Sequence, residues 1–289
     1  MTLAGLTDLL ARARAERIAV GAFNVFSIEH AEALVTGAEA VQSPVVLQIS
    51  QNAVRYHRGL APIALATLSL ARAATVPAVV HLDHATDLAL VAEAVELGFT
   101  SVMYDGSALD VEANVATTAQ VVADCHRRGI DVEAELGEVG GKDGVHAPGA
   151  RTRPDEAVEF VRATGIDALA VAVGSSHAMT ERSASLDLDL IRRLHAAVEV
   201  PLVLHGSSGV PDAEIVRAVN AGMTKINIAT HLNTIFTGVV RATLAADPSM
   251  VDSRKYLGPA RDTVAGEVSR LLVMLAARPS AGERHPVMA

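Results

Sequence analysis

The chain contains eight short hydrophobic runs rich in Val, Ile and Ala, and segments with the apolar spacing of amphipathic helices lie between them. The runs are continuous rather than alternating, which is typical of strands that are buried on both faces of a parallel sheet. Helical spacing is present at residues 28–41, 88–97, 114–128, 155–163, 188–198 and 212–221, and in the first twenty residues. We predict strands at residues 19–27, 45–50, 78–84, 101–106, 132–139, 168–176, 201–208 and 225–230.

Eight strand–helix units in this chain leave about 36 residues for each unit, a normal length for a parallel crossover. The pattern predicts an α/β fold, a (β/α)8 TIM barrel in which residues 1–289 form a single domain. A doubly wound open sheet is the alternative, but no Gly-x-Gly-x-x-Gly motif opens a helix after the first strand. We predict that residues 244–289 form a C-terminal helical extension that ends in a loose tail at about 275–289.

Composition and charge narrow the classes of function. Hydrophobic residues make up 50% and charged residues 20% of the chain, so a large folded core is expected. A net charge of −9, scattered basic residues and the absence of Trp argue against nucleic acid as a partner. The one cysteine, Cys125, excludes a disulfide framework and a metal site built from cysteines. No run approaches the ~20 apolar residues of a membrane span, so we expect no membrane partner and a cytoplasmic location.

Three histidines end predicted strands of the barrel, where TIM-barrel active sites lie. His84, His177 and His205 lie at the ends of the third, sixth and seventh strands, and three imidazoles with one open position predict a catalytic zinc site. Asp83 is the candidate for proton transfer. Because neighbouring residues of a strand point to opposite sides, Asp83 and His84 can share the site only if the strand end bends. His81 has the parity of Asp83, and we expect it to be structural or to orient a ligand.

Two other segments have the character of substrate-binding loops. HGSSG at residues 205–209 precedes a helix, NIAT at 227–230 ends the eighth strand, and the loops after strands 7 and 8 of such barrels commonly hold phosphate. The Gly-rich segment 137–152 predicts a mobile lid, in which Lys142 and Asp143 would reach substrate; a passive surface loop is the alternative.

The motifs HLDHATD, GFTSVMYDGS, VEAELGEVGGKDG, VGSSH, LHGSSG and KINIAT occur in an order and spacing that resemble the class II, zinc-dependent ketose-bisphosphate aldolases, over residues 1 to about 270. The resemblance implies cleavage of a fructose- or tagatose-bisphosphate-like ketose into dihydroxyacetone phosphate and an aldehyde, or the reverse condensation. It implies one Zn²⁺ per chain, held by His84, His177 and His205, with Glu135 as an alternate ligand and Asp83 as the acid/base. Members often also bind Na⁺ or K⁺ near the phosphate. We expect substrate contacts from Asn24, Ser50, Gly206, Ser207, Ser208, Asn227, Ala229, Thr230 and Arg254.

In that family the arginine can come from a neighbouring subunit, and we expect a homodimer or homotetramer. Three features depart from the family pattern and concern substrate contacts. AMTE at 178–181 replaces the common Gly-x-Tyr-Lys, and the predicted lid reads GGKDG at 140–144 where many relatives have two acidic residues before the last Gly. His231 stands where an acidic residue is frequent.

Three alternatives stay open at this stage. A Schiff-base aldolase needs a lysine at the C-terminal end of a strand, whereas Lys225 is expected to begin its strand, and Lys142 and Lys255 lie in a loop and the tail. A metal-dependent sugar-phosphate isomerase or epimerase would use related chemistry without breaking a C–C bond. A non-catalytic sugar-phosphate-binding subunit would keep only the barrel.

Overall fold

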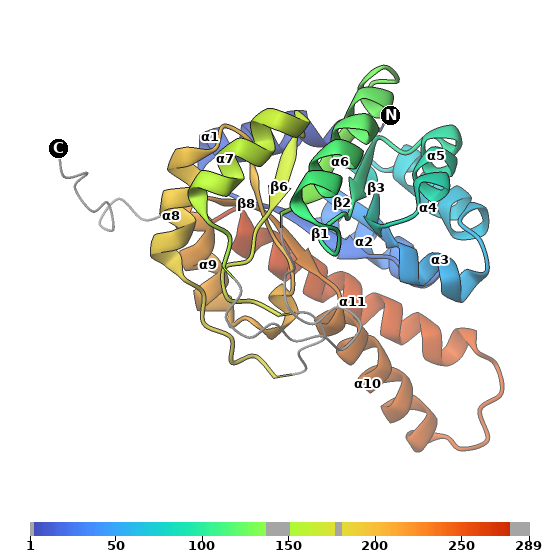
Figure 1. The fold of residues 1–289 in the computed structure, drawn as a ribbon. Helices are drawn as coiled ribbons and strands as arrows, with labels where there is room; N and C mark the ends of the chain where they lie inside the picture. The colour runs from blue at the N-terminus through green and yellow to red at the C-terminus, as the bar shows by residue number, and fades with distance from the viewer. Residues whose placement is uncertain (1–2, 137–150, 177–180, 278–289) are drawn as a thin grey trace.

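The computed structural model describes residues 3–136, 151–176 and 181–277. Eight parallel strands form a closed barrel in the order β1 to β8, and β8 pairs with β1 to complete it (Figure 1). The TIM barrel is thereby confirmed, and the closed strand order excludes the open sheet. The strands are Val20–Asn24 (β1), Val45–Ser50 (β2), Ala78–Ala85 (β3), Ser101–Tyr104 (β4), Asp131–Glu135 (β5), Ala168–Ala170 (β6), Leu202–Leu204 (β7) and Met223–Ile228 (β8).

Helices cover the outside of the barrel, and one short helix closes its N-terminal end. Leu6, Leu10 and Ala13 of α1 pack against inward-facing residues of the strands, among them Val46 and Met103, and so plug that end with apolar side chains. The helices are Leu6–Glu16 (α1), Ile28–Ala40 (α2), Gln51–His57 (α3), Ala61–Ala73 (α4), Leu88–Leu97 (α5), Val111–His126 (α6), Pro154–Thr164 (α7), Leu188–Ala197 (α8), Asp212–Ala221 (α9), Thr230–Ala246 (α10) and Arg254–Leu275 (α11), with a 3₁₀ turn at Ser207–Gly209 (η1).

Local sequence explains several of the helix boundaries. Asp87, Asp110 and Asp187 accept a hydrogen bond from a backbone N–H in the first turn of α5, α6 and α8. Gly98 and Gly165 end α5 and α7 in the left-handed conformation that glycine adopts without strain. Each strand begins within two residues of its predicted start, whereas β6 and β7 end several residues before their predicted ends. The C-terminal ends of all eight strands meet at one mouth of the barrel.

Two expectations about the C-terminal part were wrong. β8 begins at Met223, directly after the end of α9 at Gly222, so that Lys225 is an interior residue of the strand and not its first. The helical extension begins at Thr230 rather than near residue 244, since α10 follows β8 at once and α11 returns to pack along α2 and α10 (Figure 1). Residues 278–289, most of the expected tail, lie outside the described part of the chain.

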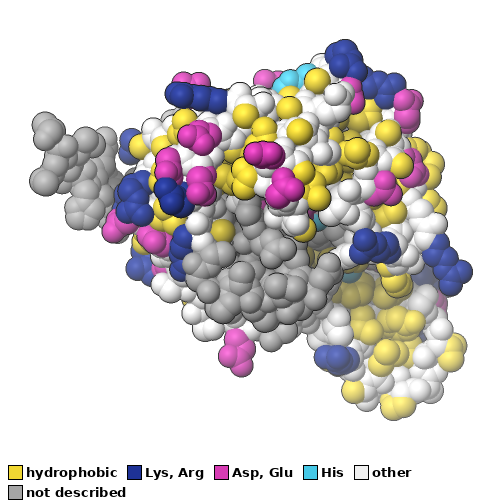
Figure 2. Space-filling model, in the orientation of Figure 1, with side chains coloured by type: hydrophobic (Ala, Val, Ile, Leu, Met, Phe, Trp, Pro, Cys, Tyr) yellow, Lys and Arg dark blue, Asp and Glu magenta, His cyan; other side chains and the backbone are white. Residues whose placement is uncertain are grey.

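The surface has a mixed distribution of charge. On the face shown in Figure 2, Lys and Arg side chains are interspersed with Asp and Glu. Among the described residues, no helix has the length and apolar character needed to cross a bilayer.

Candidate active site

The end of β3 is bent, which brings two neighbouring side chains to the same mouth of the barrel. The pairing of β3 with β4 shifts in register between Leu82 and Ala85, and His84 has a left-handed backbone with φ of 49°. As a result Asp83 hydrogen-bonds Asn24 at the end of β1, while His84 contacts His205 just beyond the end of β7. The bend that the sequence required for a shared site is therefore present.

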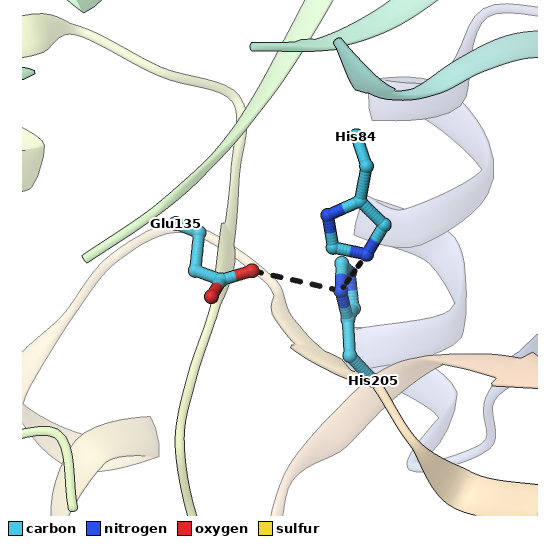
Figure 3. Close-up of side chains that lie close together, drawn as sticks. All are labelled: His84, Glu135 and His205. Carbon is cyan, nitrogen blue, oxygen red and sulfur yellow. Dashed lines mark hydrogen bonds and ion pairs between the residues drawn. The ribbon is translucent and has the colours of Figure 1, made fainter. Parts of the chain in front are cut away.

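His84, Glu135 and His205 converge at this mouth and could hold a metal ion together (Figure 3). One ligand atom from each lies within 4.8 Å of the others. Nε2 of His84 is 3.0 Å from Nδ1 of His205, and that Nδ1 is 3.7 Å from a carboxylate oxygen of Glu135. The third predicted histidine ligand, His177, lies outside the described residues.

The outer ring nitrogen of each histidine is held by a carboxylate. Asp105 is 2.8 Å from Nδ1 of His84, and Glu133 is 2.9 Å from Nε2 of His205. Ionised carboxylates only accept hydrogen bonds, so the ring protons lie on these outer nitrogens. The two inner nitrogens, 3.0 Å apart, then have lone pairs that could both bind one cation. The donor set therefore fits a divalent metal such as zinc.

Asp83 is buried beside this histidine–carboxylate cluster, where the side-chain amides of Asn24 and Gln48 form a line of hydrogen bonds leading to it. Gln48 donates to the side-chain oxygen of Asn24 at 2.8 Å, and Asn24 donates to Oδ2 of Asp83 at 3.2 Å. Asp83 is only 3% exposed, and its Oδ1 has no hydrogen-bond partner within the described residues. One oxygen is thus held by the protein, and the other is buried without a hydrogen-bond partner among the described residues. Ser50 pairs in register with Asp83, and its hydroxyl accepts from the N–H of Ala53 at the start of α3.

The ends of β7 and β8 are tied together beside this cluster. Ser207 donates to the backbone oxygen of Asn227, and the N–H of Ala229 donates to the hydroxyl of Ser208 at 3.2 Å. Thr230 begins α10, so the positive end of a long helix faces this corner. The buried side-chain oxygen of Asn227 has no partner within the described residues. Of these features, the start of the helix suits a bound phosphate, whereas the Asn227 oxygen would need a donor.

Gly206 fits this corner because it has no side chain. It has φ of 65°, and a Cβ there would lie 2.6 Å from backbone atoms of Ser176.

Two predicted site residues cannot be placed, a third lies away from the mouth, and one lysine that was not predicted lies inside the barrel. Lys142 and Asp143 of the predicted lid lie outside the described residues. Arg254 begins α11, where its side chain is 89% exposed and pairs with Asp252 at 2.9 Å rather than with the cluster. Lys225 is fully buried and donates to Glu133 at 2.8 Å.

Sequence reasoning gave no role to three residues that support the site, namely Gln48, Asp105 and Glu133. Each was visible as a polar group near the end of a buried strand, and Glu133 has the same strand parity as Glu135. His81, expected to be structural or supporting, is fully buried with Nδ1 2.8 Å from the hydroxyl of Ser101. Burial, followed by the positive charge of Lys225, holds the pKa of His81 well below its usual value, so this ring is neutral.

Comparisons with known proteins agree with this geometry. Residues 4–279 match the family described as fructose-bisphosphate aldolase class-II, whose members depend on a metal. A probable fructose-bisphosphate aldolase of Bacillus subtilis is 41% identical, over 91% of this chain and 94% of the relative. The fructose-bisphosphate aldolase of Geobacillus stearothermophilus is 40% identical, over 93% of this chain and 95% of the relative.

Solved structures show the same fold over nearly the whole chain. The YdjI aldolase of Escherichia coli K12 superposes with a TM-score of 0.81 at 30% identity, covering 96% of this chain and 98% of that one. A putative fructose-1,6-bisphosphate aldolase of Coccidioides immitis gives 0.82 at 32% identity, covering 93% and 96%. The barrel, the histidine–carboxylate cluster and these matches together show that the chain belongs to the class-II fructose-bisphosphate aldolase family.

Proposed function

We propose that the protein is a class II aldolase that cleaves a ketose 1,6-bisphosphate into dihydroxyacetone phosphate and glyceraldehyde 3-phosphate, and catalyses the reverse condensation. The observation that carries the proposal is the bent end of β3, which places Asp83 and the ligand His84 at one mouth of the barrel. An aldol reaction needs a proton carrier next to a group that withdraws electrons from a ketone, and this mouth can supply both.

Asp83 is the proposed proton carrier. In the cleavage direction its Oδ1 takes the proton of the C4 hydroxyl, the C4–O bond becomes the carbonyl of the aldehyde, and the C3–C4 bond breaks. The electron pair of that bond remains on the three-carbon fragment, which then takes up one proton at C3 from water or an acid of the loop after β5. Asn24 fixes Oδ2 of Asp83, so Oδ1 keeps one orientation during this transfer.

Zinc is the proposed metal, held by His84 and His205 with His177 as the third ligand and Glu135 as an alternate one. Two imidazoles whose outer nitrogens are held by Asp105 and Glu133 support this choice, since nitrogen ligands oriented by carboxylates are usual for zinc. When bound, zinc supplies Lewis-acid chemistry that draws electrons from the ketone of the substrate.

The phosphate of the three-carbon fragment is proposed to bind between the ends of β7 and β8. Ser207 and Ser208 join these two loops, and α10 begins beside them with the backbone N–H groups of its first turn. The left-handed backbone of Gly206 lets the chain pass close to Ser176 without a side chain in the way.

Product analysis with the zinc-loaded protein tests the proposal. Fructose and tagatose 1,6-bisphosphates are the substrates, and the aldehyde fragment is captured by a coupled dehydrogenase. Parallel assays in K⁺ and in Na⁺ test whether activity depends on a monovalent cation. We expect cleavage of at least one substrate and a loss of kcat of about 10²- to 10⁴-fold in Asp83→Asn, a typical contribution of general acid–base catalysis.

The matched control is Asp110→Asn, because Asn caps a helix as well as Asp does and Asp110 caps α6. Interconversion of ketoses without an aldehyde product would instead show an isomerase or epimerase, and full activity of Asp83→Asn would refute the role of Asp83.

We also propose a homodimer or homotetramer in the cytoplasm. Along α10 only Leu232 is buried, although the helix carries many apolar residues, and Val251 in the following loop is 94% exposed. A second copy would cover such a surface. Light scattering after size exclusion tests the oligomer, and a monomer at micromolar concentration would contradict it. The buried, unpaired Cys125 is consistent with a reducing compartment.

A further inference from the structure

The interior of the barrel holds a charged pair directly below the proposed metal site. Glu133 on β5 and Lys225 on β8 are both fully buried, and Lys225 donates to one oxygen of Glu133 at 2.8 Å. Glu133 lies two residues before the candidate ligand Glu135 on the same strand face, and Lys225 lies two residues before Asn227. The pair therefore occupies the layer below the residues of the mouth.

Stability alone is a poor reason for such a pair. TIM-barrel interiors are usually filled with branched apolar side chains, and removing two charges from water costs about as much free energy as their attraction returns. Replacing a buried ion pair by apolar groups of similar volume is often neutral or stabilising. A residue pair that breaks the packing rule in the centre of the core points to a functional constraint.

The second oxygen of Glu133 indicates what that constraint is. It lies 2.9 Å from Nε2 of His205, while the other oxygen is occupied by Lys225. With both oxygens engaged, the carboxylate cannot rotate, and its acceptor at His205 stays in one place. The proton of the imidazole is then kept on Nε2, and Nδ1 faces His84 at 3.0 Å with its lone pair.

We propose that Glu133 and Lys225 act as a positioning pair that fixes the ring orientation and tautomer of His205, and that metal affinity depends on both although neither touches metal or substrate. This inference rests on the proposed function, because it takes His205 as a metal ligand. Lys225 acts through Glu133, and Glu133 acts through His205.

The test uses a double variant that removes both charges and keeps the shape of the core. Glu133→Gln with Lys225→Met leaves no buried unpaired charge, so the metal-free protein should fold, with an unfolding midpoint at or above that of the wild type. An amide can offer His205 either an oxygen or an N–H, so the tautomer is no longer enforced. We expect the zinc dissociation constant to rise about 10- to 100-fold, measured by competition with a chromogenic chelator.

A second readout reports the tautomer itself. Nitrogen-15 spectra of histidine-labelled, metal-free protein should show His205 protonated on Nε2 in the wild type and a mixture of tautomers in the double variant. The single variant Lys225→Arg, in which Glu133 is unchanged, should have a zinc affinity within a few-fold of the wild type, because Arg also donates to a carboxylate.

Thr67→Val is the matched control, since Thr67 is also fully buried, lies on α4 outside the barrel interior and donates to the backbone oxygen of Ile63. Its zinc affinity should equal that of the wild type within about twofold. If the double variant binds zinc as tightly as the wild type while His205→Ala does not, the inference is wrong and the metal site stands. If His205→Ala also retains full zinc affinity, the proposed metal site itself is wrong.

Discussion

Replacing Gly206 by alanine tests the close approach between β7 and β6 on which the shape of the site depends. Gly206 has φ of 65°, and an added Cβ would lie 2.6 Å from the backbone C and O of Ser176 and 3.0 Å from its N. Backbone atoms cannot turn aside as a flexible side chain can, so the segment at Ser176 must move. That segment leads directly into the predicted zinc ligand His177.

The chain contains a control with nearly the same backbone conformation. Gly129 has φ of 70°, and a Cβ there would meet nothing within 4 Å. A left-handed alanine costs about 1 to 2 kcal/mol, offset by about 0.4 to 1 kcal/mol because alanine restricts the unfolded chain. Gly129→Ala should therefore lower the free energy of unfolding by about 1 kcal/mol. The overlap at Gly206 adds about 1 to 3 kcal/mol, the usual range for an overpacked core, for a total of about 2 to 4 kcal/mol.

Urea unfolding followed by circular dichroism measures both losses, and steady-state kinetics measures the effect on the site. Gly206→Ala should lower kcat/KM for the bisphosphate about 10- to 100-fold, since small displacements of binding groups have effects of this size. Gly129→Ala should change kcat/KM by less than about twofold. Equal destabilisation of the two variants would show that Gly206 is not pressed against Ser176. If Gly206→Ala loses more stability but keeps the kcat/KM of the wild type, the contact between the ends of β6 and β7 does not contribute to the active site.

Three further measurements follow from the structure. Zinc at 100 times its dissociation constant should stabilise the protein by about 2.7 kcal/mol, and His205→Ala should abolish that gain in a thermal melt. Burial, with a smaller contribution from the charge of Asp124, raises the pKa of Cys125 to about 11, so alkylation of the native thiol at pH 8 should be at least about 100-fold slower than after unfolding; equal rates would contradict the burial. Burial also lowers the pKa of His30, against the opposing charge of Glu29, so below about pH 6.5 the unfolded chain binds a proton that the folded chain does not. Stability should fall with decreasing pH by up to about 1.4 kcal/mol per unit from this group, and a His30→Gln variant with an equally steep profile would refute the assignment.

The fold could be predicted from the sequence because eight continuous apolar runs have few other ways to be buried than a closed parallel barrel. The ends of the strands were harder to place. The predicted sixth and seventh strands, 168–176 and 201–208, extend past Ala168–Ala170 and Leu202–Leu204 because their polar ends leave the ladder and turn toward the mouth. A run of hydrophobic residues indicates that a segment is buried but not that it pairs as a strand. Most of these loop residues are buried outside the strands, so the pattern made the predicted strands too long.

Part of the candidate site was also accessible from sequence. His84, Glu135 and His205 come together as their positions at strand ends indicate. Glu133 and Lys225 could not be paired in this way, because they are 92 residues apart and meet only when the barrel closes β8 against β1. Because β8 begins two residues before its predicted start, Lys225 lies inside the strand, and its burial was not predicted.

The end of β3 shows why local rules fail where function is concentrated. In a regular strand Asp83 and His84 would point to opposite sides, and only one of them could serve the interior. The chain resolves this by giving His84 a left-handed backbone with φ of 49°, a conformation that costs free energy in any residue other than glycine. Asp105 holds Nδ1 of the displaced His84 at 2.8 Å, and Asn24 holds Asp83 at 3.2 Å, so contacts on both sides stabilise the bend. Two adjacent residues of a single strand can then contribute a metal ligand and a proton carrier, an arrangement that no pattern of alternating side chains would have predicted.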